Sequence, residues 1–163
     1  VYFPGSTIGN LIPTQAEAML GRIARLVGRE GGLLIGIDLV KDPALLEAAY
    51  NDAEGITAEF NLNLLRRINR ELAGTFDLEQ FAHRAIYNRQ LQRIEMHLVS
   101  QGTQRVWVGG KLWEFADGES IRTEISRKYS PGGLDALMRQ AGLVIEALYV
   151  AHPPYSLVLA RPA

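Results

Sequence analysis

The sequence predicts an α/β fold: an incomplete doubly wound core with a mixed lobe inserted in it. Residues 1–40 read as strand, loop, helix and strand, which together make one βαβ unit. Residues 129–163 contain a helical pattern followed by two strand-like runs. Between them, helical periodicity gives way to the alternation that is typical of antiparallel strands. We therefore assign residues 1–40 and 129–163 to the core and residues 41–128 to the inserted lobe.

The core elements follow from apolar runs and their end signals. An apolar strand end, Val1-Tyr2-Phe3, leads into a loop, and a helix is expected from Thr14, with Glu17 at the spacing of a capping box. Gly31-Gly32 end this helix. The continuous apolar run at 33–40 is expected of a parallel strand that is buried on both faces. The last core elements are a helix at 134–140 and a closing pair of strands at 143–150 and 155–160.

The inserted lobe is expected to combine helices with an antiparallel meander. The helices are predicted at 42–50, 57–72 and 77–81, with His83 within or just after the third. Alternation from Arg93 predicts a strand up to residue 100, followed by a hairpin at 104–108 and 111–115 and a strand at 120–127. The residues of the second helix expected to face inward are Phe60, Leu64, Leu65, Ile68 and Leu72.

Composition excludes several classes of function. The 163 residues carry a net charge of −1 without a basic cluster, which argues against nucleic-acid binding. No cysteine is present, so disulfides, thiol nucleophiles and thiolate metal sites are excluded, and a reducing cytoplasm is the expected location. No apolar run is long enough to span a bilayer, so no membrane partner is expected. The three histidines lack metal-site spacing, so no metal is expected.

Two polar positions at strand ends are candidates for function. The loop after the first strand contains Gly5, Gly9 and Asn10, and ligands of α/β sheets bind at the carboxyl ends of strands. The alternative for this loop is an ordinary turn, for which glycine and asparagine are common. Asp38 ends the second strand and is either catalytic or a cap of the Lys41-Asp42-Pro43 turn; the turn interpretation is favoured.

Four separated stretches resemble the histidine-specific Nα-methyltransferases of ergothioneine biosynthesis. They are FPGSTIGN (residues 3–10), Gly36–Leu65, Arg93–Ser100 and Ile121–Ser130, and they occur in the same order over essentially the whole chain. The resemblance implies an S-adenosylmethionine (SAM)-dependent enzyme that methylates the α-amino group of L-histidine three times to give hercynine. It also implies the C-terminal half of a class I methyltransferase (Rossmann-like) sheet with an inserted α+β substrate-binding lobe, completed by a helix and two strands with a reversed edge strand.

The resemblance assigns substrate contacts to six residues. Asn10 matches the asparagine that holds the substrate amino group, Gly5 approaches that group with its main chain, and Tyr50 matches a tyrosine that binds the carboxylate. Glu124 and Ser126 match the acid and hydroxyl that face the imidazole, and Met96 matches an apolar wall of that pocket. Independently, a carboxylate and a hydroxyl two residues apart on a strand point to the same face.

These assignments have structural alternatives. Glu124 is otherwise a surface acid paired with Arg122 or Lys128, Tyr50 a core aromatic at a helix end, and Met96 core filling. For the cofactor, the resemblance leaves only the main chain of the first loop, which would contact the methionine end of SAM. The loop residues are Phe3, Pro4, Gly5, Ser6 and Thr7. No residue of the chain is expected to act as a nucleophile or as a general acid or base.

The chain lacks a glycine-rich cofactor loop after a strand, and it begins inside a strand. We interpret it as the C-terminal part of the enzyme, inactive alone, whose partner is either the N-terminal half or another copy bound at the exposed sheet edge. Two other functions are weighed: methylation of another amino acid or small amine, and a non-catalytic module that binds amino acids or a partner.

Overall fold

The computed structural model describes all 163 residues, and they divide into two compact units. The first unit comprises residues 1–42, 88–94 and 125–163, and the second comprises residues 43–87 and 95–124. In chain order, the elements are β1 (Tyr2–Phe3), η1 (Thr7–Asn10), α1 (Pro13–Val27), β2 (Leu33–Asp38), α2 (Pro43–Tyr50), α3 (Ile56–Leu72), η2 (Leu78–Gln80), β3 (Phe81–Asn88), β4 (Arg93–Ser100), β5 (Gln104–Val108), β6 (Lys111–Phe115), β7 (Ser120–Arg127), α4 (Pro131–Gln140), β8 (Leu143–Ala151) and β9 (Tyr155–Pro162).

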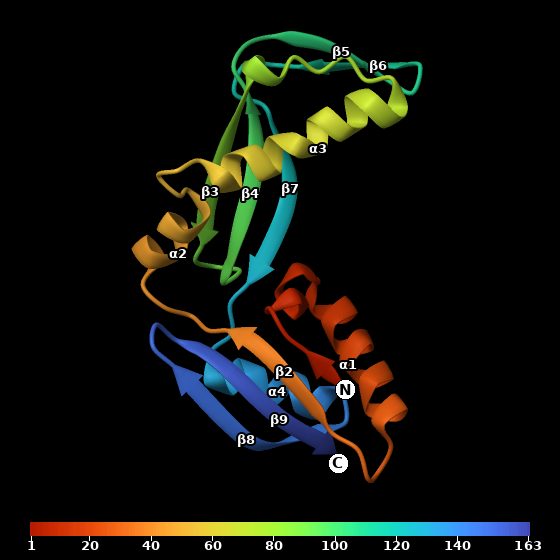
Figure 1. Cartoon of the computed structure of the whole chain (residues 1–163), viewed down its shortest axis with the longest axis vertical. Coiled ribbons are helices and arrows are strands. Elements are labelled where there is room, and N and C mark those ends of the chain that lie inside the picture. The colour runs from red at the N-terminus through yellow and green to blue at the C-terminus, as the bar shows by residue number, and fades with distance from the viewer. The chain divides into compact units, whose positions relative to one another are not determined.

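The first unit contains a four-stranded sheet in the order β1-β2-β9-β8 (Figure 1). Helix α1 connects β1 to β2, and the two strands pair in parallel. This arrangement confirms the predicted βαβ unit and the α/β fold class. Strand β9 runs antiparallel to both β2 and β8. The predicted reversed strand is therefore present, but the prediction that it forms the edge is wrong. Because β8 and β9 form a hairpin whose second strand pairs with β2, the edge strand is β8.

The core of the first unit lies on one face of this sheet. Leu33, Ile35 and Ile37 of β2 are fully buried in one apolar cluster with Leu20 of α1 and Leu134 of α4, whereas Leu34 is only half-buried. The other face of β2 is partly covered: Gly36 is buried, while Leu34 and Asp38 are half-buried, so the prediction of burial on both faces holds only in part within the chain. None of the helices is both long and apolar enough to cross a membrane.

The helix ends differ from prediction for local reasons. Helix α1 begins at Pro13, which suits a first helical position because proline lacks an N–H, so Thr14 is not its cap. The helix ends at Val27, where Gly28 adopts a φ of 63°, several residues before the predicted glycine pair. Helix α4 starts at Pro131, and the Ser130 hydroxyl caps it by accepting from the N–H of Gly133.

In the second unit, α3 packs beside a sheet in the order β3-β4-β7, most of whose residues belong to this unit. Strand β3 was not predicted: the helix expected at 77–81 is the short turn η2, and His83 lies in the strand that follows. The predicted hairpin at 104–108 and 111–115 is confirmed, but the prediction that it forms one meander with the strands on either side of it in the sequence is wrong. Strand β4 lies between β3 and β7, while β5 and β6 pair with each other in a separate hairpin.

The apolar cluster of the second unit is aromatic. Phe76 and Phe81 meet edge to face with ring centroids 5.6 Å apart, and Phe115 lies 5.6 Å from Phe81. From α3, Leu65 is fully buried in this cluster, as predicted. Three of the residues predicted to face inward are instead exposed: Phe60 at 67%, Leu64 at 40% and Leu72 at 53%.

Candidate functional site

The loop after β1 has an unusual main-chain conformation. Gly5 and Ser6 have φ values of 75° and 55°, both in the left-handed region, which a serine adopts only when its surroundings hold it there. The Ser6 hydroxyl provides such a hold, because it accepts a hydrogen bond from the N–H of Asp38 at 2.8 Å. Pro4, Gly5 and Thr7 are exposed around it, and Phe3 is half-buried. Three of the five residues expected to contact SAM are thus exposed, and that contact stays a prediction.

Helix η1 rests against the end of β7. Gly9 is buried, and a Cβ atom at this position would lie 2.7 Å from the Arg127 carbonyl oxygen and 3.1 Å from the Arg127 nitrogen. Only glycine fits this close approach without movement of the main chain. Asn10 follows as the last residue of η1 and is exposed. The contact between Gly9 and Arg127 fixes the position of Asn10 relative to the end of β7. Strand β7 carries Glu124 and Ser126, two of the predicted substrate contacts.

A buried lysine connects several of these residues. Lys128 is 1% exposed, and its Nζ atom lies 2.9 Å from Asp38 Oδ2 and donates to Ser126 Oγ at 2.9 Å. The other carboxylate oxygen of Asp38 lies 2.6 Å from Lys41 Nζ. Asp38 thus forms ion pairs with Lys41 in the turn after β2 and with a buried lysine, which was not foreseen. Lys128 is not a surface residue, and nothing near it in the sequence signals its burial.

In the second unit, a histidine holds the end of α2. The Tyr50 carbonyl can only accept, so His83 Nε2, 2.8 Å away, carries the hydrogen. His83 Nδ1 is then an acceptor for the Asn61 amide at 2.9 Å, and the same amide nitrogen donates to the His97 carbonyl at 3.1 Å. Asn61 is 3% exposed, so its side chain is part of the interior. Sequence reasoning gave His83 and Asn61 no role, although both fix the main chain that carries Tyr50.

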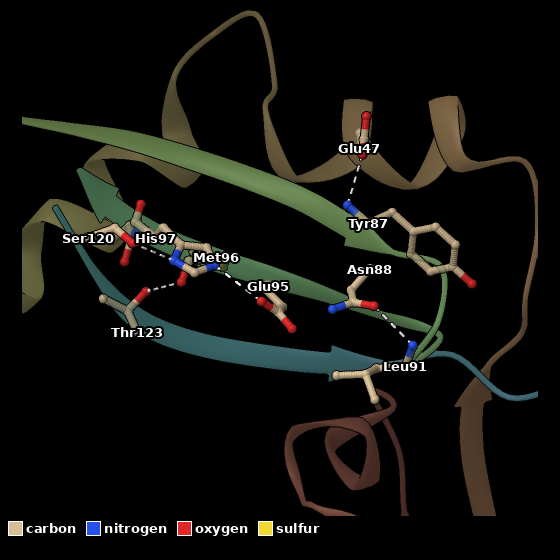
Figure 2. A network of polar contacts seen from close by, with 10 residues as sticks. Glu47, Tyr87, Asn88, Leu91, Glu95, Met96, His97, Ser120 and Thr123 are labelled. Atoms are coloured by element: carbon tan, nitrogen blue, oxygen red, sulfur yellow. Dashed lines mark hydrogen bonds and ion pairs between the residues drawn. The ribbon is translucent and has the colours of Figure 1, made fainter. Parts of the chain in front are cut away.

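Glu124 lines a cavity of about 190 Å³ in the second unit. The neighbouring Thr123 donates to the Met96 carbonyl at 3.2 Å, which ties β7 to β4 (Figure 2). Met96 itself is 3% exposed, as expected of an apolar wall and equally of core filling. The residues around the cavity come from α3 and β7: Phe60, Asn61, Asn63, Leu64, Arg67, Thr123 and Glu124.

A second polar cluster lies beside Met96. His97 is within 3.2 Å of the Ser120 hydroxyl through Nδ1 and within 3.3 Å of the buried Glu95 carboxylate through Nε2 (Figure 2). No group of three or more histidine, aspartate or glutamate side chains is arranged to hold a metal ion.

The predicted site residues fall into two sets. In the first unit, the polar cluster of Asp38 and Lys128 joins Ser6 of the first loop to Ser126 of β7. In the second unit, Met96 and Glu124 lie on neighbouring strands, and Tyr50 lies at the end of α2.

Comparison with known proteins gives one family and several relatives. The family described as "Histidine-specific methyltransferase, SAM-dependent" matches residues 1–162. The chain is 45% identical over 145 residues to the histidine N-alpha-methyltransferase of Mycolicibacterium smegmatis, covering 88% of this chain and 45% of that protein. It is 34% identical to ergothioneine biosynthesis protein 1 of Neurospora crassa, covering 85% of this chain and 16% of that protein. The chain thus spans less than half the length of these relatives.

Solved structures show the same fold at low identity. The CcbJ methyltransferase from Streptomyces caelestis aligns with a TM-score of 0.52 at 14% identity, covering 100% of this chain and 56% of that one. An S-adenosylmethionine-dependent methyltransferase from Clostridium acetobutylicum aligns with a TM-score of 0.50 at 9% identity, covering 99% of this chain and 57% of that one.

Proposed function

Because the chain belongs to the histidine-specific, SAM-dependent methyltransferase family, we propose that it supplies the substrate-binding part of an enzyme that trimethylates the α-amino group of L-histidine to hercynine. The observation that carries the proposal is the family match over nearly every residue, together with 45% identity to a histidine N-alpha-methyltransferase. The chain has the fold of class I methyltransferases, which is compatible with this activity.

The chemistry asks the protein mainly for positioning. The cofactor supplies an activated methyl group, and the amine must present its lone pair in line with that group. Asn10 is exposed at the end of η1, where its amide oxygen and nitrogen can hold an amino group. The neighbouring main chain of residues 3–7 is the part of the loop that would contact SAM. Because Gly9 seats η1 against Arg127, the amine-holding side chain is fixed relative to the strand that carries Ser126.

The remaining contacts would select histidine. In the proposal, Glu124 accepts the imidazole N–H, the Ser126 hydroxyl bonds the other ring nitrogen, Met96 walls the pocket, and Tyr50 binds the substrate carboxylate. A site built to hydrogen-bond a polar side chain rejects analogues that lack those groups, since its own polar atoms would remain unpaired. Glu124 is half-buried, which supports this role more than that of a surface acid, although Met96 and Ser126 do not line the cavity beside Glu124.

The test is a substrate competition with the protein in its encoded length. Histidine is offered in mixtures with other amino acids, and mass spectrometry follows the mono-, di- and trimethylated products. Glu124→Ala is expected to weaken histidine binding far more than SAM binding, while Glu124→Gln, which keeps a hydrogen-bonding group, is the matched control. Equal turnover of several amino acids would refute the histidine assignment.

The sheet edge supports a further part of the proposal. Strand β1 lies at the edge of its sheet, and Tyr2 is 68% exposed. Unpaired main-chain groups and apolar side chains at such an edge favour pairing with another polypeptide. We expect a polypeptide limited to residues 1–163 to self-associate or to bind a complementary segment, and to bind SAM poorly. Light scattering and calorimetry test this, and a stable monomer with micromolar SAM affinity would contradict it.

A cytoplasmic location is proposed because the chain contains no cysteine, which suits a reducing compartment.

A further inference from the structure

A cavity between α1 and α4 contains polar groups that the proposed contacts with histidine and SAM do not use. Its volume is about 290 Å³, and every residue that lines it belongs to the first compact unit. Tyr129 and Leu137 line it and are only 5% and 8% exposed, whereas Thr14 of α1 and Gln140 of α4 are exposed at its edge. The cavity therefore opens to solvent and ends on buried side chains.

Two buried polar atoms at this cavity have no hydrogen-bond partner. They are the hydroxyl oxygen of Tyr129 and the Nε atom of Arg127, and both residues line the cavity. The Arg127 guanidinium lies over the Tyr129 ring, 5.6 Å from its centroid, so the two groups form one cluster. A buried polar group without a partner lowers stability, and nearly all such groups in proteins are paired. The cluster therefore points to a ligand in the cavity.

The hydroxyl of Tyr129 is held in this position. The main-chain N–H of Tyr129 donates to the Asp38 carbonyl at 3.1 Å, and the Tyr129 carbonyl accepts from the N–H of Val40 at 3.0 Å. Its side chain belongs to the apolar cluster of the unit, so the ring cannot turn away without disturbing the core. One water molecule would satisfy the hydroxyl, but a water occupies only about 30 Å³ in the liquid, and the cavity is several times larger.

The unpaired groups favour a carboxylate. Arg127 Nε can only donate. Burial raises the pKa of the Tyr129 hydroxyl, although the charge of Arg127 acts in the opposite direction, so this hydroxyl keeps its proton and can also donate. Two donors next to a guanidinium charge suit a carboxylate, which accepts with both oxygens. Glu17 also lines the cavity, and its negative charge opposes a dianion such as phosphate.

We propose that this cavity binds a small organic carboxylate of single negative charge, whose oxygens accept from Arg127 and from the Tyr129 hydroxyl and whose carbon body packs against Leu137. None of the residues that line the cavity is among the proposed contacts with histidine or SAM. Binding at this cavity thus goes beyond the proposed function and does not depend on it.

The test is a titration of the protein at its encoded length with benzoate, followed by calorimetry. Histidine and S-adenosylhomocysteine are present at saturating concentration, so that the proposed substrate site is filled. Benzamide, which has the same shape without the charge, is the matched probe. Tyr129→Phe removes only the hydroxyl, and Arg127→Gln removes the charge. The control variants make the same changes outside the cavity: Tyr149→Phe on β8, where the tyrosine is 63% exposed, and Arg139→Gln on the surface of α4.

Loss of a hydrogen bond to a charged group predicts that Tyr129→Phe raises the Kd of benzoate about 10-fold or more, and Arg127→Gln at least as much. Both control variants are expected to change this Kd less than about twofold. Benzamide is expected to bind wild-type protein at least about 10-fold more weakly than benzoate. Without benzoate, the Tm of Tyr129→Phe is expected to equal or exceed that of wild type, because the hydroxyl that it removes has no partner in the protein.

Four results would overturn the proposal. They are no saturation of wild-type protein with benzoate up to about 10 mM, equal affinity of wild type and Tyr129→Phe, equal affinity for benzoate and benzamide, and equal losses in the cavity and control variants. A lower Tm of Tyr129→Phe without benzoate, together with absent binding, would show that the encoded protein already pairs this hydroxyl. If Arg127→Gln does not fold, Tyr129→Phe decides alone. A wild-type protein that binds benzoate but does not methylate histidine would overturn the proposed function and leave the carboxylate site standing.

Discussion

Addition of one methyl group at Gly9 tests how the loop after β1 is held. In Gly9→Ala, the new Cβ would lie 2.7 Å from the Arg127 carbonyl oxygen. Non-bonded carbon atoms pack at about 3.5–4.0 Å, so this contact cannot be accommodated as it stands. The obstructing atoms belong to main chain, which cannot rotate away as the end of a side chain can. Either η1 or the end of β7 must move.

The expected cost follows from this overlap. Overpacking of a close contact typically lowers the free energy of unfolding by about 1–3 kcal/mol. For a chain of this size, each kcal/mol shifts the Tm by about 2–4 °C, so the melting temperature should fall by about 2–12 °C. Movement of η1 would also displace Asn10, the residue after Gly9. The KM for histidine is therefore expected to rise even where the protein remains folded.

The matched control adds the same atom at a glycine where it meets only ordinary van der Waals contacts. Gly21 lies within α1, where a Cβ would meet only ordinary contacts, 3.8 Å from the Ala141 oxygen and 3.9 Å from the Arg25 side chain. Gly21→Ala should be neutral or stabilising, by up to about 1 kcal/mol, because alanine favours helix. Thermal melts and urea titrations of both variants decide the matter. If Gly9→Ala is as stable as Gly21→Ala and its KM for histidine is unchanged, the close approach at Arg127 does not hold the loop.

Three further expectations concern the interior, acid stability and catalysis. Asn61→Leu should lower the free energy of unfolding by about 1–3 kcal/mol in urea titrations, because His83 and His97 lose their donor, whereas Asn63→Leu on the exposed side should have little effect. Hydrogen bonds from Thr57 and Ile56 lower the pKa of Asp52 to about 2 from its ordinary 3.8. Its stabilisation is therefore complete above the ordinary pKa and is lost as pH falls toward the lowered value, and Asp52→Asn should flatten stability curves over that interval. Methylation should accelerate toward alkaline pH, because only the neutral amine has a lone pair; a flat profile between about pH 6 and 9, with chemistry rate-limiting, would contradict this.

Elements with strong local patterns were predicted well. The continuous apolar run that forms β2 and the alternation that forms β4 are both visible in the local sequence, so tertiary contacts were not needed to find these strands. Strand β3 was missed because Phe81, Ala82 and Ala85 do not alternate with polar residues. That strand forms because β4 offers it a partner, which is information that a single stretch of sequence does not contain.

The orientation of α3 shows a similar limit. Its apolar residues cover a wide arc, and the sequence alone cannot tell which part of the arc packs inward. The structure buries Leu65 together with the polar Asn61 and leaves Phe60 exposed. Burial of an amide is acceptable here because its hydrogen bonds to His83 and His97 satisfy it. The partners of a buried polar group come from distant strands, so composition and spacing do not reveal them.

The candidate site residues were chosen by resemblance, whereas the residues that contact them could be found only from the structure. Asp38 supplies its main-chain N–H to Ser6 and its carboxylate to Lys128, so one residue at the end of β2 determines the conformation of the first loop and the environment of Ser126. Parallel strands bring their carboxyl ends to the same edge of a sheet, and the loops that follow must be fixed there if they are to position a small substrate. A buried charge is costly, but it connects these loops through directional bonds that apolar packing would not provide. Residues that hold such a site in place can therefore be as decisive for substrate selection as residues that touch the substrate.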